Sequence, residues 1–239
     1  MKALVGCWAV LGALTAHAAG FSVGRVDIEF ADEGWKELSL PDQEVAFGGD
    51  KAGALDVASK LYLRGTPDGD DQILVIVGAH SEGIGGGRAS RMSYSPKCRS
   101  DEQNYREGNE GFRESFAQCL VVTPRYNSES VFKALAPELL ALQASGVVSV
   151  RRPVYTVWSH HAISTGSFVD VRVFVISPIG VDKATVEDTL PKGVLPEHVA
   201  WGRQLKDAVK SSVYSLSGRL VVPAIRLSPS ASGAAGGGG

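Results

Sequence analysis

The sequence predicts an α+β domain with a mainly antiparallel sheet and helices packed on it. Strand-like runs occur in adjacent pairs over residues 55–79 and 154–176, and helical patterns follow turn signals near residues 127 and 196. The chain lacks the regular strand–helix alternation of a parallel sheet. Because the central runs are apolar on both faces, we expect cover on both sides of the sheet, and a three-layer sandwich is one form that this cover can take.

Two hairpins form the centre of the predicted sheet. Residues 72–79 are a continuous, β-branched run after the turn-rich residues 66–71, as in a strand buried on both faces. Apolar and polar residues alternate upstream, over residues 55–64, which predicts a partner strand with one wetter face. The second hairpin joins residues 154–164 to 167–176.

The loop of the second hairpin determines which side chains face each other. If Thr165-Gly166 forms a two-residue loop, His161 lies opposite Asp170. The same register places His160 on the face that carries the valines of the second strand, as a buried and hydrogen-bonded histidine. We expect the His161–Asp170 pair to be a structural contact.

Helices are expected in two places. Asn127 or Ser128 can cap a helix that Pro137 kinks or restarts and that ends before Gly146. The stronger helix begins near Pro196 and ends before Gly218. Its apolar stripe consists of Trp201, Leu205, Ala208, Val209, Ser212, Val213 and Leu216.

Domain boundaries follow from the two ends of the chain. Residues 228–239 contain only Ser, Pro, Ala and Gly, so we expect a disordered tail. We assign residues 19–227 to a single α+β domain, because no linker of similar composition interrupts them. Residues 109–123 are ambiguous, with a helical spacing of Phe112 and Phe116 before a strand-like run.

The first 18 residues resemble a cleaved secretory signal peptide. Met1-Lys2 is a positive start, residues 3–15 are uncharged and largely apolar, and Ala16 and Ala18 have the small side chains that a signal peptidase reads. Thirteen helical residues span about 20 Å, too short for a bilayer core of about 30 Å. We therefore expect export to the periplasm or the exterior, with no integral membrane segment after cleavage.

Two cysteines, Cys98 and Cys119, remain once Cys7 is removed with the leader. In an oxidising compartment such a pair forms a disulfide, worth about 3 kcal/mol in the chain-entropy model. No Cys-x-x-Cys or His-x-x-x-His spacing accompanies them, so a zinc site is not expected. A reduced, catalytic role for these cysteines is the alternative.

The charge balance is nearly even, with 24 Lys and Arg against 26 Asp and Glu. A protein that binds nucleic acid through phosphate contacts needs a basic surface. Nucleic acid is therefore not an expected partner. The mixed charges of residues 99–114 indicate a solvated surface, or alternatively a surface for a protein partner.

The segment Ala79-His80-Ser81-Glu82-Gly83 is similar to the nucleophile elbow of some small lipases of the α/β-hydrolase family. That resemblance implies Ser81 as nucleophile, Asp170 or Asp182 as acid and His198 as base. An elbow needs a helix directly after the serine, but residues 83–87 contain four glycines. A glycine-rich loop is thus the preferred interpretation.

Two further candidates for chemistry are weak. Residues 83–88 lack the endings of a P-loop or dinucleotide fingerprint, although their amides and Arg88 could hold a small anion. His160 and His161 are adjacent in a strand, point to opposite faces and cannot readily bind one metal. A metal site would require a further ligand such as His80 or Glu82, and we expect neither a metal nor a cofactor.

The sequence therefore favours an exported, non-catalytic domain of unknown specific role, acting as an envelope accessory protein that binds a protein or small-molecule partner. No catalytic residues are assigned, and the ligand-binding residues are not identifiable from the sequence. The alternative is a serine hydrolase or esterase that uses Ser81.

Overall fold

A computed structural model describes residues 21–23, 25–39, 43–46, 54–69, 71–80, 98, 103–109, 116–149, 152–163, 167–177, 190–215 and 217–225. The expected leader, residues 1–18, and the expected tail, residues 228–239, lie outside these ranges. So do the glycine-rich residues 83–88 and Phe112.

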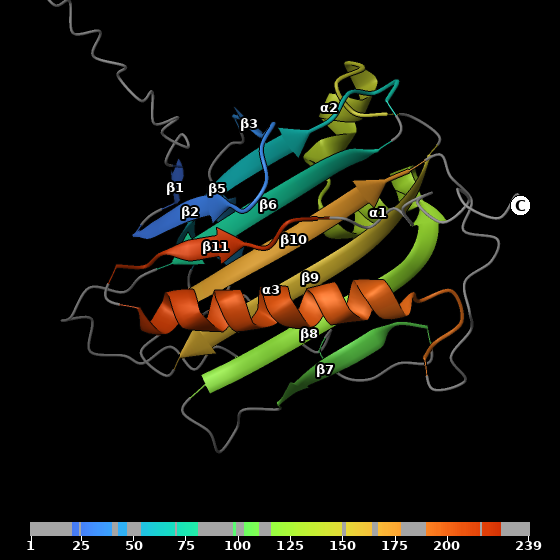
Figure 1. Cartoon of the computed structure of the whole chain (residues 1–239). Coiled ribbons are helices and arrows are strands. Elements are labelled where there is room, and N and C mark those ends of the chain that lie inside the picture. Colours follow the sequence, from blue (N-terminus) through green and yellow to red (C-terminus); the bar gives the residue numbers. More distant parts are fainter. Residues whose placement is uncertain are drawn as a thin grey trace, which may run out of the picture.

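A large antiparallel sheet forms the centre of the described structure (Figure 1). Its strands run in the order β3, β5, β6, β10, β9, β8 and β7, and β4 also pairs with β5. The bounds are β3 Lys36–Leu38, β4 Gln43–Ala46, β5 Ala54–Arg64, β6 Gln72–His80, β7 Tyr105–Asn109, β8 Phe116–Asn127, β9 Pro153–Ile163 and β10 Phe168–Ile176. The class predicted from the sequence, α+β with a mainly antiparallel sheet, is confirmed.

Both predicted hairpins are present and lie side by side. β5 pairs with β6, β9 pairs with β10, and β6 and β10 are neighbours in the sheet. Within the ambiguous residues 109–123, residues 116–123 belong to strand β8, which pairs with β7. Eight of the nine residues of β6 are buried, as its continuous apolar run predicted.

The predicted register of the second hairpin is wrong by one residue. Asp170 lies opposite His160, and His161 lies opposite Val169. Ile163 donates a backbone hydrogen bond to Ser167 at 3.0 Å, so the loop spans three residues and not two. Because side chains alternate along a strand, this single-residue shift exchanges the faces on which the two histidines lie.

The helices begin and end close to the predicted signals. α1 is Ser128–Leu135, and the side chain of its N-cap, Asn127, accepts hydrogen bonds from the backbone amides of Glu129 and Ser130. Pro137 separates α1 from α2, Leu139–Ala144, which ends before Gly146 at φ 78°. α3 is Pro196–Tyr214.

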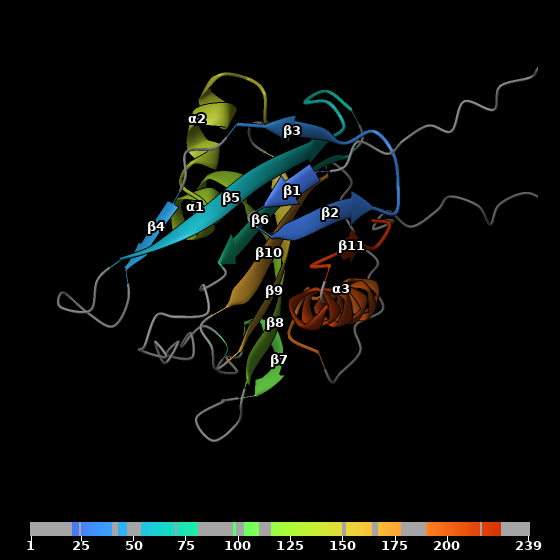
Figure 2. The same ribbon diagram turned by 90° about the vertical axis from the view of Figure 1, so that its left-hand side faces the viewer.

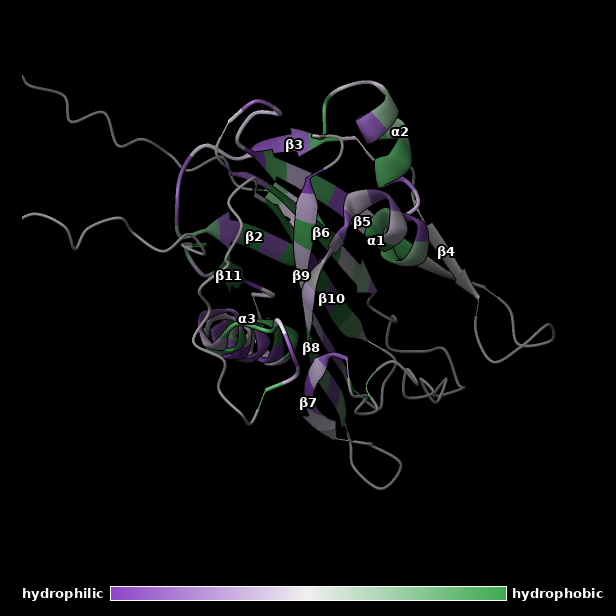
Figure 3. Ribbon diagram, turned by 90° about the vertical axis from the view of Figure 1, so that its right-hand side faces the viewer, coloured by the Kyte–Doolittle hydropathy of each residue, from purple (hydrophilic) through white to green (hydrophobic). Residues whose placement is uncertain are grey.

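Two apolar cores lie on opposite faces of the sheet (Figures 2 and 3). On one face, α3 contacts β8, β9 and β10, with Leu205 and Val209 fully buried. Gly202 allows this approach, because a Cβ there would lie 3.0 Å from a methyl carbon of Leu120. On the other face, Phe132 of α1 packs against Phe174 of β10, with ring centroids 5.8 Å apart.

A small second sheet joins the two ends of the described chain. It consists of β1 Phe21–Val23, β2 Val26–Phe30 and β11 Leu220–Val222, in the order β1-β2-β11. β2 and β11 are parallel, with Ile28 opposite Leu220. The small sheet shares the apolar core of α3 and lies beside that helix in Figure 1.

Candidate functional site

Asp170 is the centre of a polar cluster on the face of the sheet that also carries α1. Its Oδ1 accepts a hydrogen bond from Nε of Arg172 at 3.0 Å. Its Oδ2 accepts one from Nε1 of Trp158 and lies 3.2 Å from Nδ1 of His160. We call these four residues the Asp170 cluster. Asp170 is 8% exposed, so the carboxylate fixes three side chains in a largely buried setting.

The strand register builds this cluster. His160 lies opposite Asp170, and Trp158 lies opposite Arg172. Residues two apart in a strand share a face, so all four side chains project from the same side of β9 and β10.

The charge of Asp170 determines the hydrogen bonding of its neighbours. Burial raises the pKa of Asp170, but the charge of Arg172 and the hydrogen bonds from His160 and Trp158 outweigh burial and lower that pKa to about 2. An ionised carboxylate only accepts hydrogen bonds, so Nδ1 of His160 carries the proton. Nε2 of a neutral His160 is then the nitrogen with a lone pair.

A pocket of about 120 Å³ adjoins the Asp170 cluster. Strands β7, β8, β9 and β10, the last residue of α1, and Asn104 directly before β7 supply its walls. The polar part of the wall is formed by Asn104, Arg106, Thr123, Thr156 and Arg172. The apolar part is formed by Val121, Leu135 and Trp158.

The polar groups of this pocket differ in how they are satisfied. Oγ1 of Thr123 accepts a hydrogen bond from the backbone amide of Thr156 at 3.0 Å. Nη1 of Arg172 donates to the carbonyl of Leu135 at 2.7 Å. Thr156 is 1% exposed, and its hydroxyl has no hydrogen-bond partner among the described residues. An unsatisfied buried hydroxyl costs about 1–3 kcal/mol, which a ligand in the pocket could recover.

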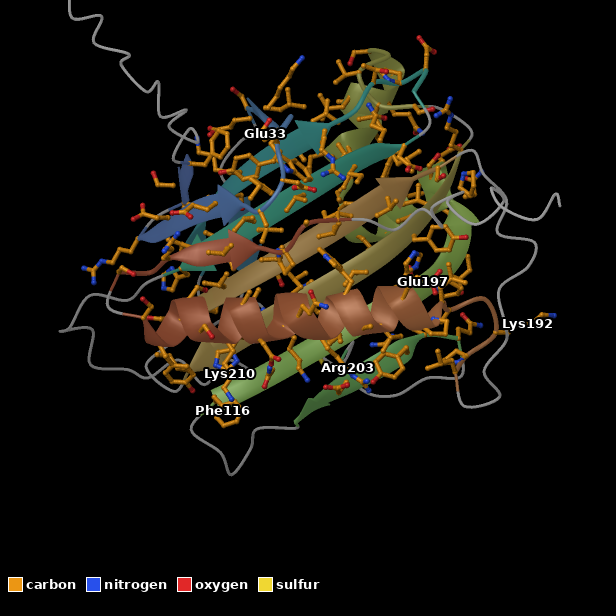
Figure 4. All side chains as sticks on the ribbon, viewed as in Figure 1. Glu33, Phe116, Lys192, Glu197, Arg203 and Lys210 are labelled. Atoms are coloured by element: carbon orange, nitrogen blue, oxygen red, sulfur yellow. A yellow bond between two sulfur atoms is a disulfide. The ribbon has the colours of Figure 1, made fainter. Side chains whose placement is uncertain are left out.

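His161 lies on the opposite face, in the core beneath α3. It is fully buried between Phe116 and Tyr214, with ring centroids 5.5 and 5.3 Å away. Neither ring nitrogen has a hydrogen-bond partner in the described part of the chain. Burial, followed by the nearby charges of His160 and Lys210, lowers the pKa of His161 to about 4. Lys210 lies over the ring of Phe116, and both residues are labelled in Figure 4.

A charged cluster on the outer side of α3 attaches the helix to β7. Glu107 accepts hydrogen bonds from Lys206 and from Arg203, the latter at 2.8 Å. Arg203 is labelled on α3 in Figure 4. Burial raises the pKa of Glu107, but the hydrogen bonds from Lys206, Tyr105 and Arg203 outweigh it and lower that pKa to about 2. These groups satisfy one another, and we assign them a structural role.

Cys98 and Cys119 lie at disulfide distance, with Cα atoms 5.6 Å apart, and are bonded in the structure. Both are buried, and they pack with Val121 and Trp158. Cys119 lies opposite His160 in the sheet. The disulfide therefore supports the strands that carry the Asp170 cluster and the apolar wall of the pocket.

The structure places the hydrolase candidates apart where it describes them. His198 is buried on α3 against Tyr155, with ring centroids 4.7 Å apart. Tyr155 projects from the α3 face of β9, whereas Asp170 lies opposite His160 on the other face. His198 and Asp170 are thus on opposite sides of the sheet. Ser81 and Asp182 lie outside the described residues.

The described residues contain no group of three or more His, Cys, Asp or Glu side chains arranged to hold a metal ion. None of their helices is long and apolar enough to cross a membrane. Glu82, named above as a further ligand, lies outside these residues.

The pocket has no continuous signature in the sequence. Its wall combines residues from four strands and one helix, and β7 was not expected as a strand. One signal was available: Trp158 and His160 in one strand, with Asp170 and Arg172 in the next, are polar or amphipathic residues at alternate positions. With a three-residue loop, that pattern places all four on one face.

The fold and this pocket define the protein as an α+β domain with a small, partly charged cavity at the side of its main sheet. Comparison of the chain with protein-family models, with curated proteins and with solved structures finds no match.

Proposed function

We propose that this protein is an exported, non-catalytic domain that binds a small ligand in the pocket beside the Asp170 cluster. The observation that carries the proposal is Thr156, a residue of the wall of the pocket of about 120 Å³, whose buried hydroxyl has no partner among the described residues. Buried polar groups are normally satisfied, and an exception in a cavity wall indicates a bound partner.

Export is part of this proposal. It is supported by the signal-like residues 1–18 and by the pairing of Cys98 with Cys119, because disulfides persist in oxidising compartments. The proposed domain spans residues 19–227, with residues 228–239 as a tail. The apolar cores on both faces of the main sheet support a three-layer arrangement.

The test fills the pocket and asks whether a ligand is lost. Leu135→Trp adds a large side chain at the pocket wall, and Ala134→Trp adds the same side chain at the neighbouring exposed position of α1. Native mass spectrometry of exported protein should detect a bound small molecule in the wild type and in Ala134→Trp, and none in Leu135→Trp. Two results together would refute the proposal. The wild-type protein would carry no ligand, and small organic probes would cause no change in the NMR resonances of the pocket residues.

A serine hydrolase that uses Ser81 is the second candidate, and one observation favours a revised version of it. His160 is in contact with Asp170, as a general base would be with its acid. The ring of Phe168 lies 5.6 Å from that of His160 and 5.8 Å from that of His80, the residue before Ser81. In this version His160 replaces His198 as the base.

Labelling with a fluorophosphonate probe tests the hydrolase. Labelling of the wild type that disappears in Ser81→Ala and falls strongly in His160→Gln, together with ester turnover, would establish the enzyme and overturn the non-catalytic proposal. His198→Gln is the matched control and should label normally if it folds. Absence of labelling in the wild type would eliminate the hydrolase.

A further inference from the structure

We propose that the pocket binds a small monocarboxylate with a short apolar body, and that Arg172 and Thr156 hold the carboxylate group. This inference rests on the proposed function, because it takes the pocket to be the ligand site. It adds the chemical class of the ligand and the two residues that select it.

The register arranges the pocket as two rows of side chains across the sheet. In the first row, Arg106 lies opposite Val121, Val121 opposite Trp158, and Trp158 opposite Arg172. This row has a guanidinium group at each end and two apolar side chains between them. In the second row, Thr123 lies opposite Thr156. A pair of threonine side chains therefore lies next to the two apolar side chains of the first row.

Arg172 keeps donors for a ligand after its structural bonds are made. A guanidinium group has five N–H donors. One at Nε is taken by Asp170 and one at Nη1 by the carbonyl of Leu135. Within the described part of the chain, no acceptor takes the remaining three. Its two structural bonds hold the guanidinium in place, so its remaining donors are oriented before a ligand arrives.

Thr156 is correctly placed to act with Arg172. Because Arg172 lies opposite Trp158, Thr156 is its diagonal neighbour on the same face. Diagonal neighbours are about 7–8 Å apart at Cα, within reach of a long side chain. One carboxylate oxygen can accept from Arg172 while the other accepts from the Thr156 hydroxyl, which satisfies the buried group that the protein leaves without a partner.

The ionised Asp170 favours a ligand with a single negative charge. Its carboxylate lies 3.0 Å from Nε of Arg172, the cation that would hold the ligand. A monocarboxylate brings one negative charge close to Asp170, whereas a phosphate dianion would bring two and be repelled more strongly.

The size and the floor of the pocket limit the rest of the ligand. An apolar cavity of about 150 Å³ holds a benzene ring in other proteins. At about 120 Å³, this pocket accepts a slightly smaller group, or a ring that stays partly outside. Val121, Leu135 and Trp158 provide the apolar surface for that group. Isobutyrate and benzoate are therefore suitable probes.

The experiment is a calorimetric titration of the folded, oxidised full chain with isobutyrate, benzoate, their neutral amides and inorganic phosphate. We expect each carboxylate to bind at least about tenfold more tightly than its amide and more tightly than phosphate. Thr156→Val should weaken carboxylate binding about tenfold and leave amide binding almost unchanged, and Thr156→Ser should restore the affinity. Arg219→Gln, a matched charge change in the exposed pair with Glu29, should bind like the wild type.

Arg172→Lys and Arg172→Gln complete the set. Both should lose most of the preference for carboxylate over amide, since a lysine does not reproduce the geometry of a guanidinium group. If Arg172→Gln fails to fold because Asp170 loses a partner, the Thr156 variants still decide the outcome.

Each result has one interpretation. Amides that bind as tightly as carboxylates, or carboxylate binding that is unchanged in Thr156→Val, would overturn the assigned class while the pocket remains a binding site. Tighter binding of phosphate would also overturn it. If none of the probes perturbs pocket resonances in NMR and native protein carries no ligand, the proposed function itself fails.

Discussion

The two adjacent histidines of β9 lie in opposite environments. His160 contacts an ionised carboxylate and shares it with Trp158 and Arg172. His161, one residue further, lies in an apolar core between Phe116 and Tyr214 with no hydrogen-bond partner in the described structure. One face of the sheet thus carries a hydrogen-bonded polar site, and the other carries a neutral histidine that acts as a packing group.

This contrast shows how strongly the strand register determines chemistry. Neighbouring residues of the same type differ in their surroundings and in their partners only because they point to opposite sides. The face beneath α3 stabilises the fold, whereas the face with the Asp170 cluster offers a pocket.

The Asp170 cluster should be the most sensitive element of its face. Asp170→Ala removes the acceptor of three side chains and leaves the Arg172 charge without its carboxylate, so we expect a loss of about 4 kcal/mol in the free energy of unfolding. Chemical denaturation measures this loss. Asp207→Ala, at an exposed position of α3, is the control and should have little effect. A loss below about 1 kcal/mol for Asp170→Ala would contradict the central role of this carboxylate.

His161 should make the protein less stable in mild acid. Its pKa is about 4 in the folded protein, below the ordinary value of 6.5, so the unfolded chain binds the proton more readily. The contribution of neutral His161 to the free energy of unfolding is therefore intact above pH 6.5. About 2–3 kcal/mol of that free energy is lost as the pH falls towards 4. Urea unfolding at several pH values measures the loss. His161→Leu should remove it, and an unchanged pH dependence in that variant would refute this account.

The two threonines of the pocket should respond with opposite signs. Thr156→Val removes a buried hydroxyl that has no partner in the described structure, so we expect a gain of about 1 kcal/mol. Thr123→Val removes the acceptor of the Thr156 amide and should lose about 1 kcal/mol. Thermal and chemical denaturation measure both changes. Destabilisation by Thr156→Val would mean that its hydroxyl is already satisfied.

The exposed ion pair of Arg219 and Glu29 should contribute least. The two side chains are 58% and 39% exposed, and such pairs are screened by water and salt. We expect Arg219→Gln to leave the denaturant midpoint unchanged within error at physiological salt. A clear shift would show that the β2–β11 contact depends on this pair.

The sequence allowed four adjacent strands of the main sheet, β5, β6, β9 and β10, and the helices of the described residues to be predicted. The apolar run of β6, the Asn127 cap and the first-turn Pro196 are local signals, and each is found where it was expected. The register of β9 and β10 was missed because Thr165-Gly166 suits a two-residue loop, whereas the backbone uses three residues. Since the side-chain period is two, an error of one residue assigned the wrong histidine to Asp170.

Other parts could not be predicted for a different reason. β1, β2 and β11 are three to five residues long, and the parallel pairing of β2 with β11 leaves no local pattern. The pocket similarly depends on residues as distant in the sequence as Arg106 and Arg172, which line one cavity from different strands. Only the three-dimensional order of the strands brings these residues together.

The pairing of Ile28 with Leu220 also has a consequence for when the protein can fold. Asp32 accepts a hydrogen bond from the amide of Ile225 at 3.1 Å, so a second contact joins the same distant segments. The small sheet cannot close until almost the whole domain has been synthesised, and contacts of such high sequence separation form slowly. A chain that must cross a membrane unfolded would benefit from this delay, because its first strands wait for a partner that emerges last.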